Sequence, residues 1–125
     1  MKTNMVGWFE IPVSDMDRAK TFYETVFQIQ IQVMDFGGLK MGWFPSQGAE
    51  AYGSPGTLIQ QESYIPSKEG TMVYFISEDV QNELSRIKDA GGQIYLEKRQ
   101  ISPEYGYMGV FIDSEGNRVA LHSMQ

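Results

Sequence analysis

The strongest constraint on the fold of this chain is an internal repeat. A strand-like run at residues 9–16 has a counterpart at residues 73–80, and each run places an acidic residue, Asp15 or Asp79, before an apolar periodic segment. The two acidic residues are 64 positions apart. A repeat at a fixed spacing indicates one supersecondary unit that is used more than once, because a single copy cannot bury its own apolar face.

Each acidic residue is expected to begin a helix, because its carboxylate can accept hydrogen bonds from the free N–H groups of the first turn. Apolar residues then recur at spacings of three and four, which places them on one helix face. The second helix is expected to end at Gly91 and Gly92, where a left-handed residue closes the last turn without a Cβ clash. The apolar residues are Met16, Ala19, Phe22, Tyr23 and Val26 in the first helix, and Val80, Leu84, Ile87 and Ala90 in the second.

Alternating strand patterns follow each helix. The run Met41–Phe44 is echoed by Met108–Phe111, and the last strand of each copy follows a glycine, Gly56 or Gly116. Strands that alternate with single helices in this order indicate two βαβββ modules. The sequence therefore predicts an α+β fold.

The repeat also predicts how the chain is organised. Its length of 125 residues is that of a single domain. Module one is expected over about residues 5–62 and module two over about residues 70–123, with a hinge at about residues 62–70.

Composition and charge exclude several classes of function. With a net charge of −6, a pI near 4.7 and no basic cluster, the chain lacks a surface for nucleic acid. It has no cysteine, which excludes disulfides, thiolate nucleophiles and Cys-based zinc sites. No apolar stretch approaches the roughly 18–20 residues that cross a bilayer, and we identify no signal peptide. We expect a soluble cytoplasmic protein with no nucleic-acid or membrane partner.

Two groups of residues carry a resemblance to a known family: Phe9–Ala19 with Phe22–Glu24 near the start, and Phe111–His122 near the end. In these residues the chain resembles the vicinal oxygen chelate superfamily, which includes glyoxalase I, the bleomycin- and fosfomycin-resistance proteins and the extradiol dioxygenases. The resemblance implies a curved, half-open mixed β-barrel with helices outside and a ligand cavity inside. It also implies a homodimer that binds a small molecule.

Strand alternation predicts which side chains face this cavity, because successive residues of a strand point to opposite faces. Residues such as Ile11, Val13, Val119 and Leu121 are expected to pack against the helices. The residues expected to face inward are Trp8, Glu10 and Pro12, then Leu58, Gln60 and Glu62, then Met72, Tyr74 and Ile76, and finally Arg118, Ala120 and His122.

The resemblance carries the family's metal-ligand positions to Trp8, Gln60, Met72 and Ala120. An indole, a neutral amide, a thioether and a methyl group are poor ligands for a divalent ion, which prefers carboxylate oxygen or imidazole nitrogen. We therefore expect no metal at these positions, and no cofactor.

A second ring of inward residues lies two positions further along the same strands and comprises Glu10, Glu62, Tyr74 and His122. One hypothesis is a hydrogen-bonded polar cluster that lines a binding cavity. Another is acid–base catalysis by Glu10 and His122 with support from Tyr74, and a third is a displaced divalent-metal site at Glu10, Glu62 and His122. The position of Glu62 depends on strand register, since a shift of one residue turns it to the other face.

Other side chains are candidates for ligand contact. Aromatic and sulfur-containing residues suit a planar or apolar ligand, and an arginine can pair with an anionic group. The stretch at residues 48–56 is expected to form a mobile loop over the cavity mouth. The candidate substrate-binding residues are Trp8, Trp43, Glu62, Met72 and Arg118, together with Tyr74 and Tyr107 as parts of an aromatic wall.

Two functions remain open at this point. The first is a glyoxalase-like small-molecule enzyme with lyase or isomerase chemistry, carried by Glu10, His122 and Tyr74. The second is a metal-free protein that binds or sequesters a hydrophobic or aromatic compound.

Overall fold

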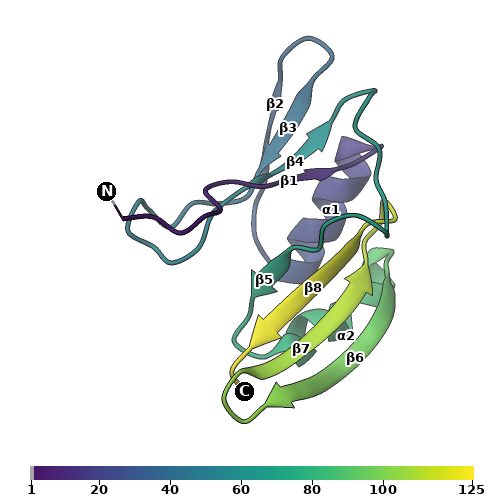
Figure 1. Ribbon diagram of the computed structural model, residues 1–125. Coiled ribbons are helices and arrows are strands. Elements are labelled where there is room, and N and C mark those ends of the chain that lie inside the picture. Colours follow the sequence, from purple (N-terminus) through teal and green to yellow (C-terminus); the bar gives the residue numbers. More distant parts are fainter. Residues whose placement is uncertain (1) are drawn as a thin grey trace.

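The computed structural model describes residues 2–125 as two modules in the predicted βαβββ order (Figure 1). No helix in this part of the chain is long and apolar enough to span a bilayer. The first module contains β1 (Glu10–Pro12), α1 (Met16–Phe27), β2 (Gln32–Asp35), β3 (Lys40–Trp43) and β4 (Thr57–Gln60). The second contains β5 (Tyr74–Ile76), α2 (Val80–Ala90), β6 (Gln93–Ser102), β7 (Gly106–Ile112) and β8 (Arg118–Ser123).

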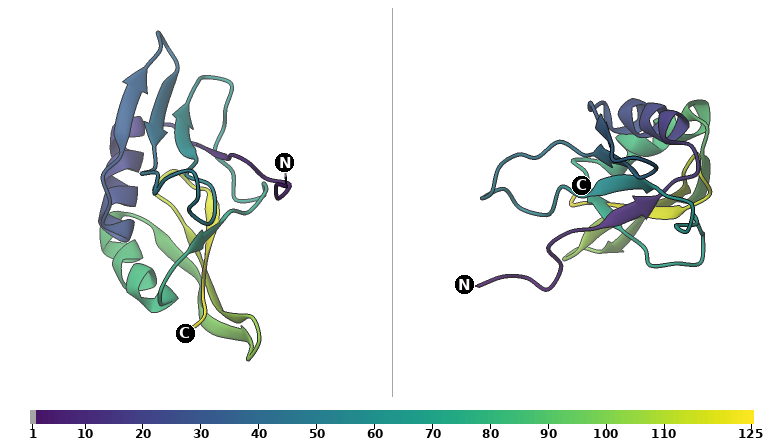
Figure 2. Two further views of the ribbon diagram at one scale, coloured as in Figure 1. Left: turned by 90° about the vertical axis from the view of Figure 1, so that its left-hand side faces the viewer. Right: turned by 90° about the horizontal axis from the view of Figure 1, so that it is seen from above.

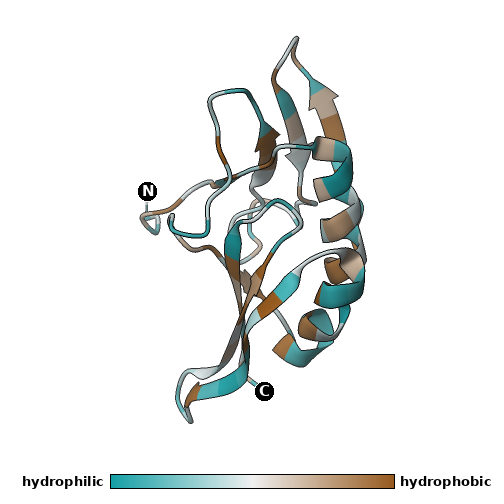
Figure 3. Ribbon diagram, turned by 90° about the vertical axis from the view of Figure 1, so that its right-hand side faces the viewer, coloured by the Kyte–Doolittle hydropathy of each residue, from teal (hydrophilic) through white to brown (hydrophobic). Residues whose placement is uncertain are grey.

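Each module forms its own four-stranded mixed sheet. The strand order is β1-β4-β3-β2 in the first sheet and β5-β8-β7-β6 in the second. The first and last strands of each module pair in parallel, and the remaining pairs are antiparallel. Both helices lie on the same side of the two sheets (Figures 2 and 3). The α+β class and the two βαβββ modules are confirmed, and within one chain the two sheets do not close into a barrel.

Both helices begin, and α2 ends, as their sequences predict. Asp15 accepts a hydrogen bond from the Arg18 N–H at 3.1 Å, and Asp79 accepts one from the Gln81 N–H at 2.9 Å. Gly91 ends α2 in the left-handed region at φ 107°. The predicted capping residues are therefore confirmed at both helix starts and at the end of α2.

The repeated Met-Gly motif has a packing reason. A Cβ at Gly42 would lie 3.0 Å from the Met16 Sδ, and a Cβ at Gly109 would lie 2.8 Å from the Leu84 Cδ1. Each glycine therefore sits where a sheet presses against its own helix. The motif recurs because both modules need the same close approach.

Aromatic side chains from both modules share one core. Phe75 of β5 lies 4.7 Å, between ring centroids, from Phe27 of α1 and 5.3 Å from Phe44, which follows β3. Phe111 of β7 lies 5.9 Å from Phe22 of α1. Each ring buries a large apolar area, so these contacts join the modules as well as filling them.

The β7–β8 turn, residues 113–117, fastens the second module to the first, and we call it the inter-module clasp. The Tyr23 hydroxyl donates to the Asp113 carboxylate at 2.6 Å, and the Asn117 side-chain amide donates to the Pro12 carbonyl at 2.7 Å. Burial, followed by the neighbouring Asp113 charge, raises the pKa of Tyr23 well above its ordinary value. The hydroxyl therefore stays protonated as a donor.

Glu115 gives the clasp its charged contact. Its carboxylate accepts from the Arg18 Nε at 2.7 Å and from the backbone N–H groups of Ser14 and Asp15, both at 2.9 Å. Burial alone would raise the pKa of Glu115, yet these hydrogen bonds outweigh it and hold the pKa below its ordinary value. The ionised carboxylate thus ties the start of α1 to the second module.

One strand presents the opposite face from the one expected. Leu58 of β4 is fully buried in the core, and the Gln60 side chain accepts a hydrogen bond from the Met16 N–H at 2.7 Å. Thr57 and Ile59 occupy the other face of β4. The prediction that Leu58 and Gln60 face the cavity is therefore wrong, because the register of β4 differs by an odd number of residues from the one assumed.

Two further orientations also differ from the expectation. Glu62 lies exposed in the turn after β4, so it does not project from the strand. Tyr107 packs against the core on the helix side of its sheet, with the Lys98 Nζ 4.7 Å from its ring centroid. Neither residue belongs to the inward aromatic and polar set predicted for it.

Candidate functional site

The side of the two sheets turned away from the helices is the candidate site, and we call it the helix-free face. Residues such as Ile11, Leu58 and Leu121 pack toward the helices, so their strand neighbours point to the helix-free face. This agrees with the alternation predicted for β1, β5 and β8. The residues of the helix-free face include Trp8, Glu10, Trp43, Thr57 and Ile59 from the first module, and Tyr74, Ile76, Arg118, Ala120 and His122 from the second.

Two tryptophans form an aromatic pair on the first module. The Trp8 and Trp43 rings lie 5.2 Å apart between centroids at 62°, an edge-to-face arrangement. Trp8 precedes β1 and is 39% exposed, whereas Trp43 ends β3 and is less exposed. The pair offers an apolar, polarizable surface with one ring open to solvent.

Beside the tryptophans, two buried polar atoms have no hydrogen-bond partner: Trp43 Nε1 and Thr57 Oγ1. The two residues face each other across β3 and β4, and Glu10 faces Thr57 across β1 and β4. A donor, a hydroxyl and a carboxylate therefore follow one another across three neighbouring strands. A buried polar group left unpaired costs roughly 1–3 kcal/mol, so such groups need an explanation.

The second module contributes a third atom of this kind, the Nε of Arg118. Arg118 faces Ile112 across β7 and β8 and alternates with Val119, which is buried in the core. Over residues 2–125, these three are all the buried side-chain nitrogen and oxygen atoms without a partner, and all three belong to the helix-free face. This face is thus where the fold leaves hydrogen bonds unmade.

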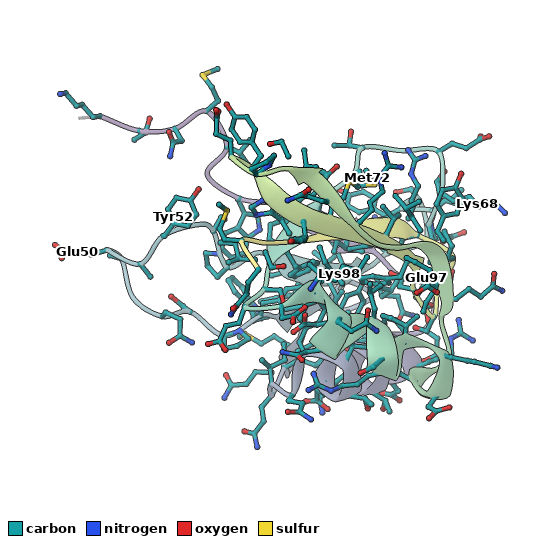
Figure 4. All side chains as sticks on the ribbon, turned by 90° about the horizontal axis from the view of Figure 1, so that it is seen from below. Glu50, Tyr52, Lys68, Met72, Glu97 and Lys98 are labelled. Atoms are coloured by element: carbon teal, nitrogen blue, oxygen red, sulfur yellow. The ribbon has the colours of Figure 1, made fainter. Side chains whose placement is uncertain are left out.

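A groove of about 590 Å³ lies beside β5 and β8 and brings Tyr74 and His122 together, as predicted. Its other wall comes from Tyr52 and Gly53 of the loop between β3 and β4, and Glu10 is not among its lining residues. The His122 Nε2 lies 2.5 Å from the Tyr105 carbonyl oxygen. Figure 4 shows Tyr52 on the projecting loop, well away from Met72.

The residues present do not fit the family's divalent metal. By strand register the counterpart of Ala120 on β4 is Thr57 rather than Gln60, because each is paired with the first residue of the parallel edge strand. The four positions then offer Trp8, Thr57, Met72 and Ala120, with no carboxylate or imidazole.

The displaced metal site is not assembled either. Within the described chain, no three His, Asp or Glu side chains gather as ligands, so Glu10, Glu62 and His122 do not form a metal-binding group. Glu62 instead lines a second, smaller groove of about 240 Å³ beside Gln61 and Tyr64. Its predicted role beside Glu10 fails because β4 ends before it.

Thr57 and Ile59 belong to this face although neither was predicted to. The signal that would have found Thr57 is the pairing of β4 with β1, which a single sequence does not reveal. Trp8, Glu10, Trp43 and Arg118 were identified from alternation or residue type.

Comparisons with known proteins find two similarities in sequence. Residues 6–42 match the family described as "Bleomycin resistance protein-like N-terminal". A relative from Didymella fabae, described as a "Glyoxylase-like domain-containing protein", is 23% identical over 121 residues, which is 93% of this chain and 91% of that protein.

Solved structures show the same fold. The antibiotic binding protein TnmS3 from Streptomyces sp. CB03234 superposes with a TM-score of 0.71 at 21% identity, over 98% of each chain. A glyoxalase I mutant from Zea mays superposes with a TM-score of 0.70 at 16% identity, over 94% of this chain. The chain spans less than half of the maize enzyme, 46% of its length. At these identities the likeness concerns the fold alone.

Proposed function

We propose, from the premise that the chain belongs to the vicinal oxygen chelate superfamily, that it is a metal-free binding protein for a small molecule. The ligand has a flat apolar body and a hydrogen-bonding group, and it lies on the helix-free face beside Trp8 and Trp43. The observation that most supports this is the pair of buried, unbonded atoms Trp43 Nε1 and Thr57 Oγ1. A similarly folded antibiotic binding protein makes this class of function a natural one for the fold.

Ligand access requires a side chain to move, because Trp43 Nε1 and Thr57 Oγ1 are shielded in the free chain. Trp8 suits this role, since it contacts Trp43 edge-on, is partly exposed and lies outside β1. When Trp8 swings outward, a flat ligand takes its place against Trp43. The displaced indole can then stack on the outer side of the ligand.

The free energy of this exchange favours a ligand with a polar edge. Each hydrogen bond that the ligand makes to Trp43 Nε1 or Thr57 Oγ1 contributes about 1 kcal/mol and removes an unmade bond from the free protein. Stacking on an indole adds roughly 0.5–1.5 kcal/mol beyond area burial. Together these terms are large enough to select a flat polar-edged compound over a saturated one.

Acid–base catalysis by Glu10, His122 and Tyr74 is the second candidate, and the groove that Tyr74 and His122 share is the observation in its favour. The same groove does not include Glu10, and His122 Nε2 already contacts the Tyr105 carbonyl. We therefore rank lyase or isomerase chemistry below binding. Catalysis predicts a turnover that is lost in both Glu10→Gln and His122→Ala, whereas binding predicts no such turnover.

We further propose that a second copy of the chain packs against β5 at one edge of the helix-free face, leaving the tryptophans and Arg118 accessible. Within one chain the sheets stay open, and large apolar side chains such as Tyr74 and Ile76 are 48% and 63% exposed. Light scattering is expected to give twice the chain mass of 14.2 kDa. A mass equal to that of one chain would contradict this assembly.

The proposed site makes an unusual prediction for Thr57→Val, which replaces a hydroxyl with a methyl of similar shape. Because the hydroxyl is buried and unbonded in the free protein, its removal is expected to leave the unfolding temperature unchanged or to raise it by a few degrees. A rise of that size corresponds to a gain of about 1 kcal/mol in the free energy of unfolding. Naphthol, a flat aromatic compound with one hydroxyl group, serves as the probe ligand. The same change is expected to weaken naphthol binding about tenfold, since the ligand loses a hydrogen bond. Calorimetry measures both quantities.

The exposed helix residue Thr25 provides the matched control, because Thr25→Val changes the same atoms away from the face. Decalol, the saturated counterpart of naphthol, is expected to bind more weakly than naphthol to the unmodified protein. If Thr57→Val destabilises the protein and leaves naphthol affinity unchanged, Thr57 is an ordinary satisfied core residue and the proposed site is wrong.

A further inference from the structure

Among the described residues, Arg118 is the one cation with a shielded side-chain nitrogen that lacks a hydrogen-bond partner. It is the first residue of β8, two positions before Ala120, which pairs with Tyr74 of β5. Its Nε is buried and has no hydrogen-bond partner. Its terminal nitrogens make no hydrogen bond to residues 2–125 and are absent from the buried atoms, so they remain open to solvent. The guanidinium thus has one shielded donor, the Nε, and solvent-accessible donors at its terminal nitrogens.

Within residues 2–125, no carboxylate forms an ion pair with Arg118. The ion pairs among the described residues use Arg18, Lys20 and Lys98, and none includes Arg118. The two acidic residues of the adjoining turn are already engaged, Asp113 by Tyr23 and Asn117, and Glu115 by Arg18. Other lysines and arginines of the described chain also lack an ion pair, so Arg118 is distinguished by its shielded, unbonded Nε.

The chemistry of the guanidinium identifies what fits it. Its planar fork of donors matches the two oxygens of a carboxylate, and a charge-assisted hydrogen bond is stronger than a neutral one. A neutral partner would leave the guanidinium charge unbalanced at a partly shielded position. A carboxylate balances that charge and gives the unbonded Nε a hydrogen-bond acceptor.

We propose that Arg118 determines ligand specificity, and that the ligand of the helix-free face is an aromatic carboxylic acid bound as its anion. This inference rests on the proposed function and adds the ligand's chemical class to it. The carboxylate accepts hydrogen bonds from the Arg118 Nε and one terminal nitrogen, and the flat body lies along the helix-free face. The binding is noncovalent and needs no other group.

The test compares two probes of the same shape, cinnamate and cinnamyl alcohol, by isothermal titration calorimetry on the full chain. Cinnamate is expected to bind at least about tenfold more tightly, because only the anion balances the guanidinium charge. In Arg118→Met this preference is expected to disappear, with cinnamate falling to the affinity of the alcohol and the alcohol unchanged. Arg118→Lys keeps the charge without the fork and is expected to give an intermediate preference.

Lys88→Met is the matched control, because it removes one positive charge from the exposed surface of α2, on the other side of the sheets. It is expected to leave both affinities unchanged. Equal binding of the two probes to the unmodified protein would overturn the assignment of Arg118 while leaving the proposed binding function intact. Equal loss of both probes in folded Arg118→Met would also overturn it. If neither probe binds at millimolar concentration, the proposed function itself fails, and this inference fails with it.

Discussion

Asp113→Ala is expected to lower the free energy of unfolding by about 4 kcal/mol, because it leaves several buried donors without an acceptor. Asp113 is 3% exposed, and its carboxylate accepts from the Tyr23 hydroxyl at 2.6 Å, the Asn117 N–H at 2.8 Å and the Asn117 side-chain amide at 3.0 Å. Tyr23 is itself fully buried and belongs to α1. Removing one carboxylate therefore disrupts the clasp between modules and the core at once.

Urea unfolding of Asp113→Ala, followed by circular dichroism, measures this loss. Tyr23→Phe removes only one of the bonds to the carboxylate and is expected to cost about 1 kcal/mol. Glu104→Ala, at an exposed turn between β6 and β7, is the control and is expected to change little. A loss below about 1 kcal/mol in Asp113→Ala would show that water or another side chain replaces the carboxylate, and the clasp would not hold the modules as described.

Gly92→Ala is expected to destabilise the fold by about 3 kcal/mol through a steric clash with the neighbouring strand. A Cβ there would lie 2.5 Å from the Ile112 carbonyl oxygen and 2.8 Å from the Phe22 Cε1. The backbone oxygen of β7 cannot turn away as a side chain can. The clash therefore separates α2 from its own sheet or shifts Phe22 within the shared core.

The adjoining glycine provides the comparison for this prediction. Gly91 has φ 107° and open space where its Cβ would lie, so Gly91→Ala is expected to cost about 1 kcal/mol through backbone strain alone. Unfolding midpoints of the two variants measure the difference. Equal losses of stability in Gly91→Ala and Gly92→Ala would show that these glycines are needed for the helix cap and not for the contact with β7.

Much of the fold was predictable because local physics and the repeat agree. Asp15 and Asp79 cap helices whose apolar spacing is evident, and Gly91 closes the second helix as expected. The recurrence of a glycine at Gly42 and Gly109 marks the place where each sheet meets its helix. These features depend on residues close in sequence, which is why periodicity and capping identify them.

The register of β4 was not predictable from the same repeat. Aligning Gly56 with Gly116 places Leu58 opposite Arg118 in the repeat, whereas the structure makes Leu58 the counterpart of the core residue Leu121. The resulting shift is three residues, and an odd shift exchanges the two faces of a strand. The two glycines serve different turns: Gly56 directly precedes β4, and Gly116 closes the clasp two residues before β8. Gly56 thus indicated a turn but did not determine the register in which β4 pairs.

The side-chain orientations of the site were predictable only on strands whose register was predicted correctly. Trp8, Glu10 and Arg118 follow from the strands that open and close the modules, and their predicted orientation holds. Thr57 depends on β4, so its unbonded hydroxyl was missed. Glu62 lies beyond the end of β4, so alternation along that strand does not place it beside Glu10.

The indole N–H resonances show whether a ligand occupies the helix-free face beside Trp43. The chain has two tryptophans, so a nitrogen–proton correlation spectrum shows two indole signals, and Trp8→Phe assigns them. Because Trp43 Nε1–H is buried without a partner, saturation with naphthol is expected to move its proton signal downfield and slow its exchange with water. If naphthol binds while the Trp43 indole signal stays in place, the ligand lies elsewhere, such as in the groove lined by Tyr74 and His122. That result would contradict the ligand site proposed beside Trp43.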